Sequence, residues 1–400
     1  MKKILIFSLS YYPKFVGGAE VALKEITDRI SNDYEFHMIT LRFDSSLKEV
    51  EKVGNIIVHR IGFTNNNVSV ADLKKFPLSL NKIFFQFYAF IRAWRLHRIY
   101  KFELVWAMMA HSCGVPAALF KIFFPEVKYL LTLQEGDTPQ YIKKKMLPIY
   151  PLFKKAFTKA DFIQTISTFL ASWAKDMGAE CEIKVVPNGV DLKKFSQEFS
   201  DEELKIAKQK LGKKAGEVFL ITTSRLVHKN GIDSVIEALP SLQSNIHFAI
   251  LGIGPDENKL KMLTNNLGLN NRVHFMGYVS HDEMPKYLKL SDIFIRPSRS
   301  EGMGNSFVEA MASNIPVIAT QEGGLSDFIF DNIRNKDKVP TAFAVDKDSP
   351  TQIAKAVNKI VSDKGLVSSV VVNASQMVLE KYEWTNVAKQ MKESVFDKVL

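Results

Sequence analysis

The stretch Ile293–Thr320 reads IFIRPSRSEGMGNSFVEAMASNIPVIAT, and it indicates the fold of the chain. A short apolar run at Ile293–Arg296 is followed by a polar loop, a segment with helical spacing and a second apolar run at Pro316–Ala319. Uninterrupted apolar runs of this length are typical of strands that are covered on both faces. The stretch therefore predicts a strand–helix–strand unit of a parallel sheet.

The same alternation of apolar runs and helical segments extends through the whole chain. The predicted strands are 4–9, 36–40, 56–61, 104–109, 129–134 and 162–166 in the first half, and 218–222, 247–251, 273–275, 293–296, 316–319 and 343–345 in the second. Two sets of six predict an α/β protein with two Rossmann-like, doubly wound domains. Because ligands of such sheets bind beyond the carboxyl ends of the strands, we expect the site in a central cleft that the domains face.

The domain boundary is predicted from a change in composition. A chain of 400 residues is too long for one ordinary hydrophobic core. The segment 191–217 is polar and charged, which places the boundary near 187–215. We assign residues 1–187 to the first domain, 188–375 to the second, and 376–400 to a C-terminal helix that crosses back to the first.

Composition narrows the class of protein. The net charge of +10 permits acidic partners such as nucleic acid, anionic lipid or phosphate-bearing substrates, without choosing among them. Only two cysteines occur, Cys113 and Cys181, so a disulfide framework or a cysteine zinc site is not expected, and a reducing cytoplasm fits. The N-terminus is interpreted as a buried strand and not as a signal peptide. No stretch has the length of a membrane-spanning helix.

Two glutamates, Glu301 and Glu309, flank a glycine-rich turn at 302–305. One interpretation is structural, because Ser306 and Glu309 match a capping box with Ser306 as the N-cap. That interpretation does not account for Glu301 or for the two glycines. A glycine-rich turn that leads into a helix N-terminus offers backbone donors to phosphate. Carboxylates on both sides of it can accept hydrogen bonds from sugar hydroxyls.

Two other loops have residues suited to phosphate. Arg225 and Lys229 follow the strand at 218–222, where two cations can hold a diphosphate, although a solvated surface pair is the alternative. Gly17 and Gly18 precede a helix and allow the backbone to approach a ligand closely, although an ordinary tight loop has the same pattern. The glycine spacing of a dinucleotide-binding loop is absent there.

Three of these motifs together resemble a known family. SEGMGNSFVEAMASNIPVIAT, VVPNGVD and TTSRLVHKNGID are similar, in order and context, to the signatures of retaining GT-B glycosyltransferases of the GT4 type, also called group 1. The resemblance covers most of the chain. It implies a GT-B architecture, transfer of a hexose from a UDP- or GDP-sugar to an acceptor with retention of configuration, and no cofactor.

The resemblance also implies roles for individual residues. It assigns Glu301 to hydroxyls of the donor sugar and Glu309 to those of the ribose. It assigns Arg225 and Lys229 to the diphosphate. The other implied donor-side positions are Gly17 and Gly18 beside the diphosphate, Asn305, Ser306 and Phe307 near the diphosphate and sugar, and the backbone at Tyr278 and Val279 near the base.

The sequence departs from the family pattern at two positions. Asn230 stands where many relatives have the phosphate lysine, and Lys229 comes one residue earlier. Gln134 stands where many relatives have a histidine near the transferred sugar, and an amide cannot act as a general base. His111 is the other acceptor-side candidate, with a purely structural histidine as its alternative.

No carboxylate nucleophile is assigned by the motifs, which favours front-face substitution over double displacement. In that mechanism the leaving phosphate helps to deprotonate the acceptor, while Arg225, Lys229 and helix N-termini stabilise the diphosphate. A metal ion is then not required. The single D-x-D triplet, at 346–348, is interpreted as a solvated loop.

Two segments of the first domain, 82–102 and 140–160, combine aromatic and basic residues. Such segments can lie in an anionic membrane interface, which predicts a peripheral protein at the inner face of the membrane and a lipid-linked or glycan acceptor. The alternative is that the aromatic side chains pack inward.

Other functions are compatible with parts of the pattern. A nucleic-acid-binding protein is disfavoured, because zinc-finger spacing, an RRM signature and a basic helix with heptads are all absent. A GT-B-fold nucleotide-sugar epimerase or phosphorylase would share the fold. A catalytically weak nucleotide-sugar-binding protein would share the donor site.

Overall fold

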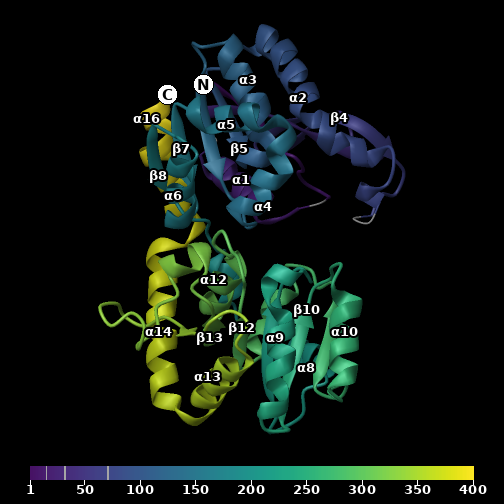
Figure 1. Cartoon of the computed structure of the whole chain (residues 1–400), viewed down its shortest axis with the longest axis vertical. Coiled ribbons are helices and arrows are strands. Elements are labelled where there is room, and N and C mark those ends of the chain that lie inside the picture. The colour runs from purple at the N-terminus through teal and green to yellow at the C-terminus, as the bar shows by residue number, and fades with distance from the viewer. Residues whose placement is uncertain (15, 31–32, 70–71) are drawn as a thin grey trace. The chain divides into compact units, whose positions relative to one another are not determined.

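The computed structural model of the chain describes residues 1–14, 16–30, 33–69 and 72–400. The chain divides into two compact units (Figure 1). Unit 1 comprises Met1–Asn188 and Trp384–Leu400, and unit 2 comprises Gly189–Glu383. Each unit has one sheet with helices packed against it, so the predicted α/β class is confirmed.

The sheet of unit 1 has eight strands in the order β3-β4-β2-β1-β5-β6-β7-β8. All neighbours in it pair in parallel except β3 and β4, which are antiparallel. The strands are β1 (Lys2–Phe7), β2 (Tyr34–Asp44), β3 (Val50–Val53), β4 (Ile56–Asn65), β5 (Leu104–Met108), β6 (Lys128–Leu133), β7 (Phe162–Thr165) and β8 (Glu182–Val185).

The helices of unit 1 come from both ends of the chain. They are α1 (Gly18–Arg29), α2 (Leu78–Tyr100), the π-helical turn η2 (Ala110–Gly114), α3 (Val115–Phe123), α4 (Pro139–Met146), α5 (Tyr150–Thr158), α6 (Thr168–Asp176), α15 (Trp384–Met391), the π-helical turn η7 (Lys392–Phe396) and α16 (Asp397–Val399), with short 3-10 turns η1 (Asp72–Lys74) and η3 (Leu147–Ile149). Trp384, Met391 and Phe396 are buried in the same core as Ile4 and Trp106. The C-terminal segment therefore completes the core that the first strand begins.

Unit 2 has a six-stranded sheet in the order β11-β10-β9-β12-β13-β14, parallel throughout. Its strands are β9 (Val218–Thr223), β10 (Ile246–Leu251), β11 (Val273–Gly277), β12 (Ile293–Arg296), β13 (Val317–Ala319) and β14 (Phe343–Ala344). Its helices are α7 (Leu192–Phe195), α8 (Asp201–Leu211), η4 (His228–Asn230), α9 (Ile232–Ala238), η5 (Leu239–Ser241), α10 (Glu257–Asn266), α11 (Met284–Lys289), α12 (Asn305–Ala312), η6 (Gly323–Asp327), α13 (Pro350–Ser362) and α14 (Lys364–Lys381).

Each of the twelve strands predicted from apolar runs overlaps a strand of the structure. The sequence gives no apolar run for β3 and β8, and both strands lie at the edges of the unit 1 sheet. Their residues alternate between exposed and half-buried positions, because only one face of each strand is covered. An uninterrupted apolar run cannot mark a strand of this kind.

The parallel order of unit 2 brings several loops to one edge of its sheet. β9 pairs with β12, and β12 pairs with β13. The loops that follow these three strands therefore leave neighbouring carboxyl ends. They begin after Thr223, Arg296 and Ala319, and they include most of the positions that the sequence singled out.

No helix among the described residues has both the length and the apolar character that crossing a membrane requires.

A pair of buried histidines joins β2 to β4. His37 Nδ1 lies 3.1 Å from His59 Nε2, and His37 Nε2 lies 2.8 Å from Glu35 Oε1. Burial is the main cause that lowers the pKa of both histidines, and it lowers the pKa of His59 to about 4. The folded protein therefore resists protonation of a pair that the unfolded chain protonates readily.

We predict that unit 1 loses stability between pH 7 and pH 5. Below pH 6.5 the unfolded state binds a proton at His59 that the folded state binds only near pH 4, so the free energy of unfolding falls as the pH falls. For His59 alone the loss is about 2 kcal/mol. All four tryptophans of the chain belong to unit 1, so urea unfolding followed by tryptophan fluorescence reports on this unit.

His59→Gln should reduce the difference between the urea midpoints at the two pH values. His281→Gln is the control, because His281 belongs to unit 2 and its side chain is 47% exposed. An equal pH dependence in wild type and His59→Gln would contradict the prediction.

Candidate functional site

The glycine-rich turn lies between β12 and α12, as predicted, but the helix begins earlier than the capping-box interpretation requires. Gly304 is the N-cap, with a φ of +86°, and it receives no side-chain cap. The prediction that Ser306 is the N-cap is wrong. A left-handed glycine starts the helix at Asn305, and Ser306 Oγ instead accepts a hydrogen bond from Arg296 Nη1 at 2.7 Å. Glu309 is thereby released from a capping role.

Both glutamates are largely buried, and each contacts one basic side chain. The side chain of Glu301 is 14% exposed, and its Oε2 accepts a hydrogen bond from Arg296 Nη2 at 3.1 Å. The side chain of Glu309 is 13% exposed, and its Oε1 lies 3.1 Å from His281 Nε2. These contacts use one oxygen of each carboxylate. The other oxygens, Oε1 of Glu301 and Oε2 of Glu309, have no hydrogen bond to a side chain in the part of the chain that the structure describes.

Arg296 lies beneath the turn and joins three of its parts. Its guanidinium donates to the carbonyl oxygen of Thr223 at 3.3 Å as well as to Ser306 and Glu301. It also stacks on the ring of Phe307, with 4.3 Å between the guanidinium carbon and the ring centroid. Burial lowers the pKa of Arg296, and the charge of Glu301 opposes that shift. Phe307 exposes no surface, so it supports Arg296 from below the turn.

The basic loop after β9 contains Arg225, which is exposed, and Lys229, which is half-buried. Asn230 is buried, and its Nδ2 donates to the carbonyl oxygen of Arg225 at 2.6 Å. The asparagine that replaces the family lysine therefore shapes the loop from inside. Gly231 has a φ of +66°, and a Cβ there would lie 2.2 Å from the carbonyl oxygen of Pro297, so the loop packs directly on the segment that follows β12.

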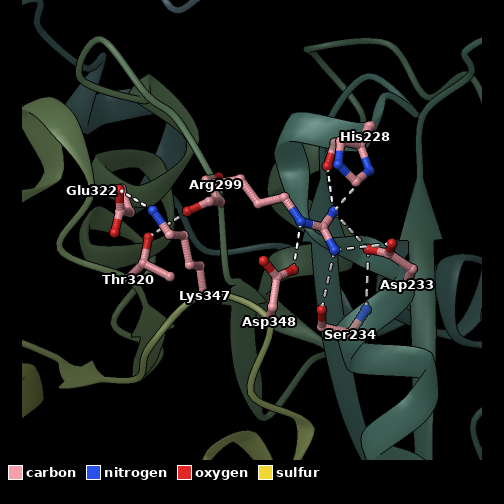
Figure 2. Close-up of polar contacts among 9 residues, drawn as sticks. His228, Asp233, Ser234, Arg299, Thr320, Glu322, Lys347 and Asp348 are labelled. Carbon is pink, nitrogen blue, oxygen red and sulfur yellow. Dashed lines mark hydrogen bonds and ion pairs between the residues drawn. The ribbon is translucent and has the colours of Figure 1, made fainter. Parts of the chain in front are cut away.

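Arg299 connects the basic loop to the segment after β12 (Figure 2). Its guanidinium pairs with both carboxylate oxygens of Asp233, at 2.9 and 3.0 Å, and with Asp348 Oδ1 at 2.6 Å. It also donates to the carbonyl oxygen of His228. The backbone N–H of Arg299 donates to the carbonyl oxygen of Lys229 at 2.6 Å. The lysine loop is thus held by both the backbone and the side chain of one residue.

The D-x-D triplet is engaged by two different arginines. Asp348 pairs with Arg299, and Asp346 Oδ1 pairs with Arg334 Nη1 at 2.8 Å. The two carboxylates therefore have separate cationic partners. All three residues of the triplet are exposed, and the side chain of Asp348 is 55% exposed, so the interpretation as a solvated loop is confirmed.

Tyr278 and Val279, the predicted base-side positions, directly follow β11. Tyr278 is 75% exposed, and its ring is one of the larger apolar surfaces of unit 2. Asn305 and Ser306 are half-buried in the first turn of α12.

In unit 1, Gly17 is the N-cap of α1 and Gly18 is its first residue. The N–H of Gly17 donates to Glu20 Oε2 at 2.7 Å, and Ser10 Oγ donates to Glu20 Oε1 at 2.8 Å. Burial raises the pKa of Glu20, and the two hydrogen bonds oppose the shift. The backbone amide of Gly17 therefore already donates its hydrogen bond to a carboxylate of the chain itself.

The two acceptor-side candidates lie together at the carboxyl ends of β5 and β6. His111 Nδ1 is 3.4 Å from Glu135 Oε1, and the N–H of Gln134 donates to Glu135 Oε2 at 3.0 Å. The side chain of Glu135 is 1% exposed. The amides of Gln134 and Asn188 form two reciprocal hydrogen bonds, each 3.0 Å long. Gln134 is thus fixed by an amide partner, while His111 is oriented by a buried carboxylate.

The two basic aromatic segments differ in how they pack. On α2 the exposed apolar side chains are 37% to 71% exposed and comprise Ile83, Phe84, Phe87, Tyr88, Ile91, Trp94 and Ile99. Lys82, Arg95 and Arg98 are exposed on the same helix, which has no acidic residue. In the segment 140–160, Tyr141 is 58% exposed but Phe153 and Phe157 are fully buried. The inward-packing alternative is therefore correct for these two phenylalanines.

Comparison with protein families assigns both halves of the chain. Residues 204–377 match the family described as glycosyl transferases group 1, and residues 16–194 match glycosyltransferase family 4. The chain belongs to the group 1 glycosyltransferases. The predicted family is confirmed, and the chain is a glycosyltransferase; retention of configuration stays a prediction.

Individual relatives are distant. An uncharacterized glycosyltransferase of Methanocaldococcus jannaschii is 26% identical over 97% of this chain and 96% of the relative. The GDP-mannose-dependent alpha-(1-6)-phosphatidylinositol monomannoside mannosyltransferase of Mycobacterium tuberculosis is 28% identical over 62% of this chain and 64% of the relative. The crystal structure of Anabaena HepE in complex with UDP-glucose is similar with a TM-score of 0.78, at 20% identity over 99% of this chain and 100% of that chain. The fold is GT-B.

The sequence motifs do not identify the residues that hold the predicted site residues in place. Arg296, Arg299, His281 and Glu135 were missed. One signal was available for Arg296, because it ends an otherwise apolar strand, IFIR, where a charge needs a partner. The partners of the other three are determined by tertiary contacts.

We predict that Gly323→Ala is more destabilising than Gly268→Ala. Both glycines have a left-handed φ, +62° and +68°, so each alanine variant is strained by about 1–2 kcal/mol. At Gly323 a Cβ would also lie 2.2 Å from the carbonyl oxygen of Glu301, whereas at Gly268 it would meet nothing within 4 Å. Thermal unfolding followed by circular dichroism compares the two. Equal losses of stability in the two variants would show that the chain relaxes away from the carbonyl oxygen of Glu301 without a cost in free energy.

Proposed function

We propose that the chain is a retaining, metal-independent glycosyltransferase that moves a hexose from a UDP- or GDP-sugar to a lipid-linked or glycan acceptor. The observation that carries the proposal is the pair of carboxylates, Glu301 and Glu309, on either side of the Gly304 turn. One oxygen of Glu301 is held by Arg296 and one oxygen of Glu309 by His281, and the other oxygen of each carboxylate is proposed to bind a ligand. Carboxylates accept hydrogen bonds only, which suits the hydroxyls of a sugar and a ribose.

In this proposal Arg225 and Lys229 bind the diphosphate. Both belong to the loop after β9, next to the strand that leads to Glu301. Positive charge there stabilises the negative charge that develops on the leaving group, a contribution that can reach about 10²–10³ in rate. Asn305 and Ser306 lie at the start of α12, where backbone donors favour an anion. Arg225→Ala should lower kcat without preventing folding, because Arg225 is exposed.

Retention is proposed to follow from front-face substitution. The leaving diphosphate helps to deprotonate the acceptor, so the chain needs no carboxylate nucleophile on the far face of the sugar. On the acceptor side, His111 is proposed to contact the acceptor, oriented by Glu135. Gln134 is held by Asn188 and cannot act as a base. The anomeric configuration of the product, read by NMR, tests retention, and an inverted product would overturn it.

The donor is proposed to be a UDP- or GDP-sugar because relatives of both kinds exist. The mycobacterial relative uses GDP-mannose, and Anabaena HepE is described in complex with UDP-glucose. A metal ion is not needed in this scheme, since Arg225 and Lys229 can neutralise the diphosphate. The aspartates of the D-x-D triplet are paired with arginines, which supports the same conclusion.

We predict that one nucleotide class stabilises the protein in the presence of EDTA. Among UDP, GDP, UDP-glucose and GDP-mannose, a ligand at 100 times its Kd should add about 2.7 kcal/mol to the free energy of unfolding. Thermal shift measures this effect. Glu309→Gln should weaken it, because the variant removes the charge that is proposed to bind the ribose.

Glu283→Gln is the matched control, since Glu283 is a half-exposed glutamate of the same unit, paired with Lys286. Equal shifts in wild type and Glu309→Gln would remove Glu309 from the donor site. Product analysis then separates the remaining functions: an epimerase leaves the nucleotide attached, a phosphorylase requires inorganic phosphate, and a binding protein shows no turnover.

The acceptor is proposed to be presented at an anionic membrane surface that α2 contacts. The exposed face of α2 combines seven large apolar side chains with cations and has no acidic residue. Interfacial helices have this composition, with apolar side chains in the acyl boundary and cations near anionic headgroups. The named activity of the mycobacterial relative on a phosphatidylinositol monomannoside fits a lipid acceptor. The proposed location is therefore the cytoplasmic face of a membrane.

We predict that the protein cosediments with phosphatidylglycerol vesicles and that binding decreases with salt. Phe87→Ser/Ile91→Ser should reduce binding at least about tenfold, because both side chains would leave the apolar boundary. Ile206→Ser/Met262→Ser is the control, since these side chains are 46% and 66% exposed but belong to unit 2. Absence of binding at low salt would contradict the membrane proposal.

A further inference from the structure

Two arginines three residues apart, Arg296 and Arg299, diverge from the end of β12. Arg296 points beneath the glycine-rich turn and Arg299 points to the loop that contains Lys229. Their side chains are 7% and 15% exposed, and both are paired with carboxylates. Ion pairs this far removed from water contribute little net stability, because desolvation offsets the attraction. Two of them in one segment are better explained by what they hold in place.

Arg296 determines which oxygen of Glu301 remains available. Its Nη2 donates to Glu301 Oε2 at 3.1 Å, and its Nη1 donates to Ser306 Oγ at 2.7 Å. One rigid planar group therefore sets the spacing between the Glu301 carboxylate and the start of α12. Stacking on Phe307 and the bond to the carbonyl of Thr223 fix the guanidinium itself.

Arg299 determines the position of the lysine loop. Its side chain bonds Asp233, which is near the start of α9, and the carbonyl of His228, while its backbone bonds the carbonyl of Lys229. It also neutralises Asp233 and Asp348, two carboxylates that would otherwise repel an anionic ligand. The loop thereby has a fixed place relative to the segment after β12.

We propose that the two arginines position different parts of the donor site. Arg296 holds Glu301 in place to bind the transferred sugar. Arg299 holds the loop that contains Lys229 in place to bind the diphosphate. The proposal rests on the proposed function, because it assumes that a nucleotide sugar binds in unit 2. It adds that the two arginines affect the affinities for the sugar and for the diphosphate in different proportions.

The test is a comparison of Kd values for three probes of increasing size, by isothermal titration calorimetry. The probes are UMP, UDP and UDP-glucose, with GMP, GDP and GDP-mannose as the second series. The variants are Arg296→Gln and Arg299→Gln. Arg296→Lys and Arg299→Lys are measured beside them, because they keep the charge if a glutamine variant does not fold.

Loss of Arg296 should raise the Kd of the nucleotide sugar at least about tenfold more than it raises the Kd values of the mono- and diphosphate, because its bond to Ser306 also supports the start of α12. Loss of Arg299 should raise the Kd values of the diphosphate and of the nucleotide sugar by the same factor and leave the monophosphate unchanged. In a Glu301→Gln background, Arg296→Gln should have no further effect on the sugar, because its partner is already altered.

Arg272→Gln is the matched control. The guanidinium of Arg272 donates to the carbonyls of Ile246 and Gln243, at the amino end of β10 and so at the opposite edge of the same sheet. Its loss should leave the ratios between the Kd values of the three probes unchanged.

Three outcomes would count against the proposal. If either arginine variant weakens all three probes of a series equally, the arginine supports the fold and positions neither group, while the proposed function stands. If Arg296→Gln raises the Kd of the nucleotide sugar by the same factor in the wild-type and Glu301→Gln backgrounds, Arg296 does not act through Glu301. If the wild type binds no probe of either series, the proposed function fails for these donors and the inference fails with it.

Discussion

A parallel sheet places the carboxyl ends of its strands at one edge, and the candidate donor site of unit 2 depends on this constraint. β9, β12 and β13 are neighbours, so the loops that follow them meet although they are far apart in the sequence. Glycines then let their backbones touch: Gly231 packs on the carbonyl of Pro297, and Gly323 on that of Glu301. Side chains bigger than hydrogen at these two positions would separate the loops.

The electrostatics of this edge follow from how its carboxylates are paired. Glu301, Asp233 and Asp348 are paired with arginines, and Glu309 with a histidine. Because the carboxylates of Glu301, Asp233 and Asp348 are compensated by arginines, they oppose the action of the exposed guanidinium of Arg225 on an anionic ligand less than unpaired carboxylates would. Each carboxylate is also fixed in orientation, which is what separates a binding site from an acidic surface.

The fold could be predicted from sequence to the extent that burial leaves a local pattern. Strands covered on both faces give apolar runs, and for this reason β1 and β12 were found while the edge strands β3 and β8 were not. Ser306 was mistaken for a helix cap because the capping pattern is local, whereas Arg296, ten residues earlier, determines what the hydroxyl binds.

The site could be predicted only for residues that belong to motifs. Glu301 and Glu309 lie in one. The contacts of Arg299 with Asp233 and Asp348 span 66 and 49 residues, and no local spacing encodes a pair so distant in sequence. The predicted domain boundaries and the roles of the donor-side residues stay predictions, because they concern ligands and arrangements beyond the described contacts.

The C-terminal segment also affects the order in which the protein can fold as it is synthesised. Unit 2 is inserted between the two parts of unit 1, and the chain passes between the units twice, where Val190 and Glu383 form a parallel bridge. Domains usually fold from the N-terminus as they leave the ribosome. Here residues 1–188 wait for residues 384–400, because Trp384 and Phe396 fill the core of unit 1. The second unit is complete first, and the nascent first unit keeps part of its apolar core uncovered until residues 384–400 have emerged.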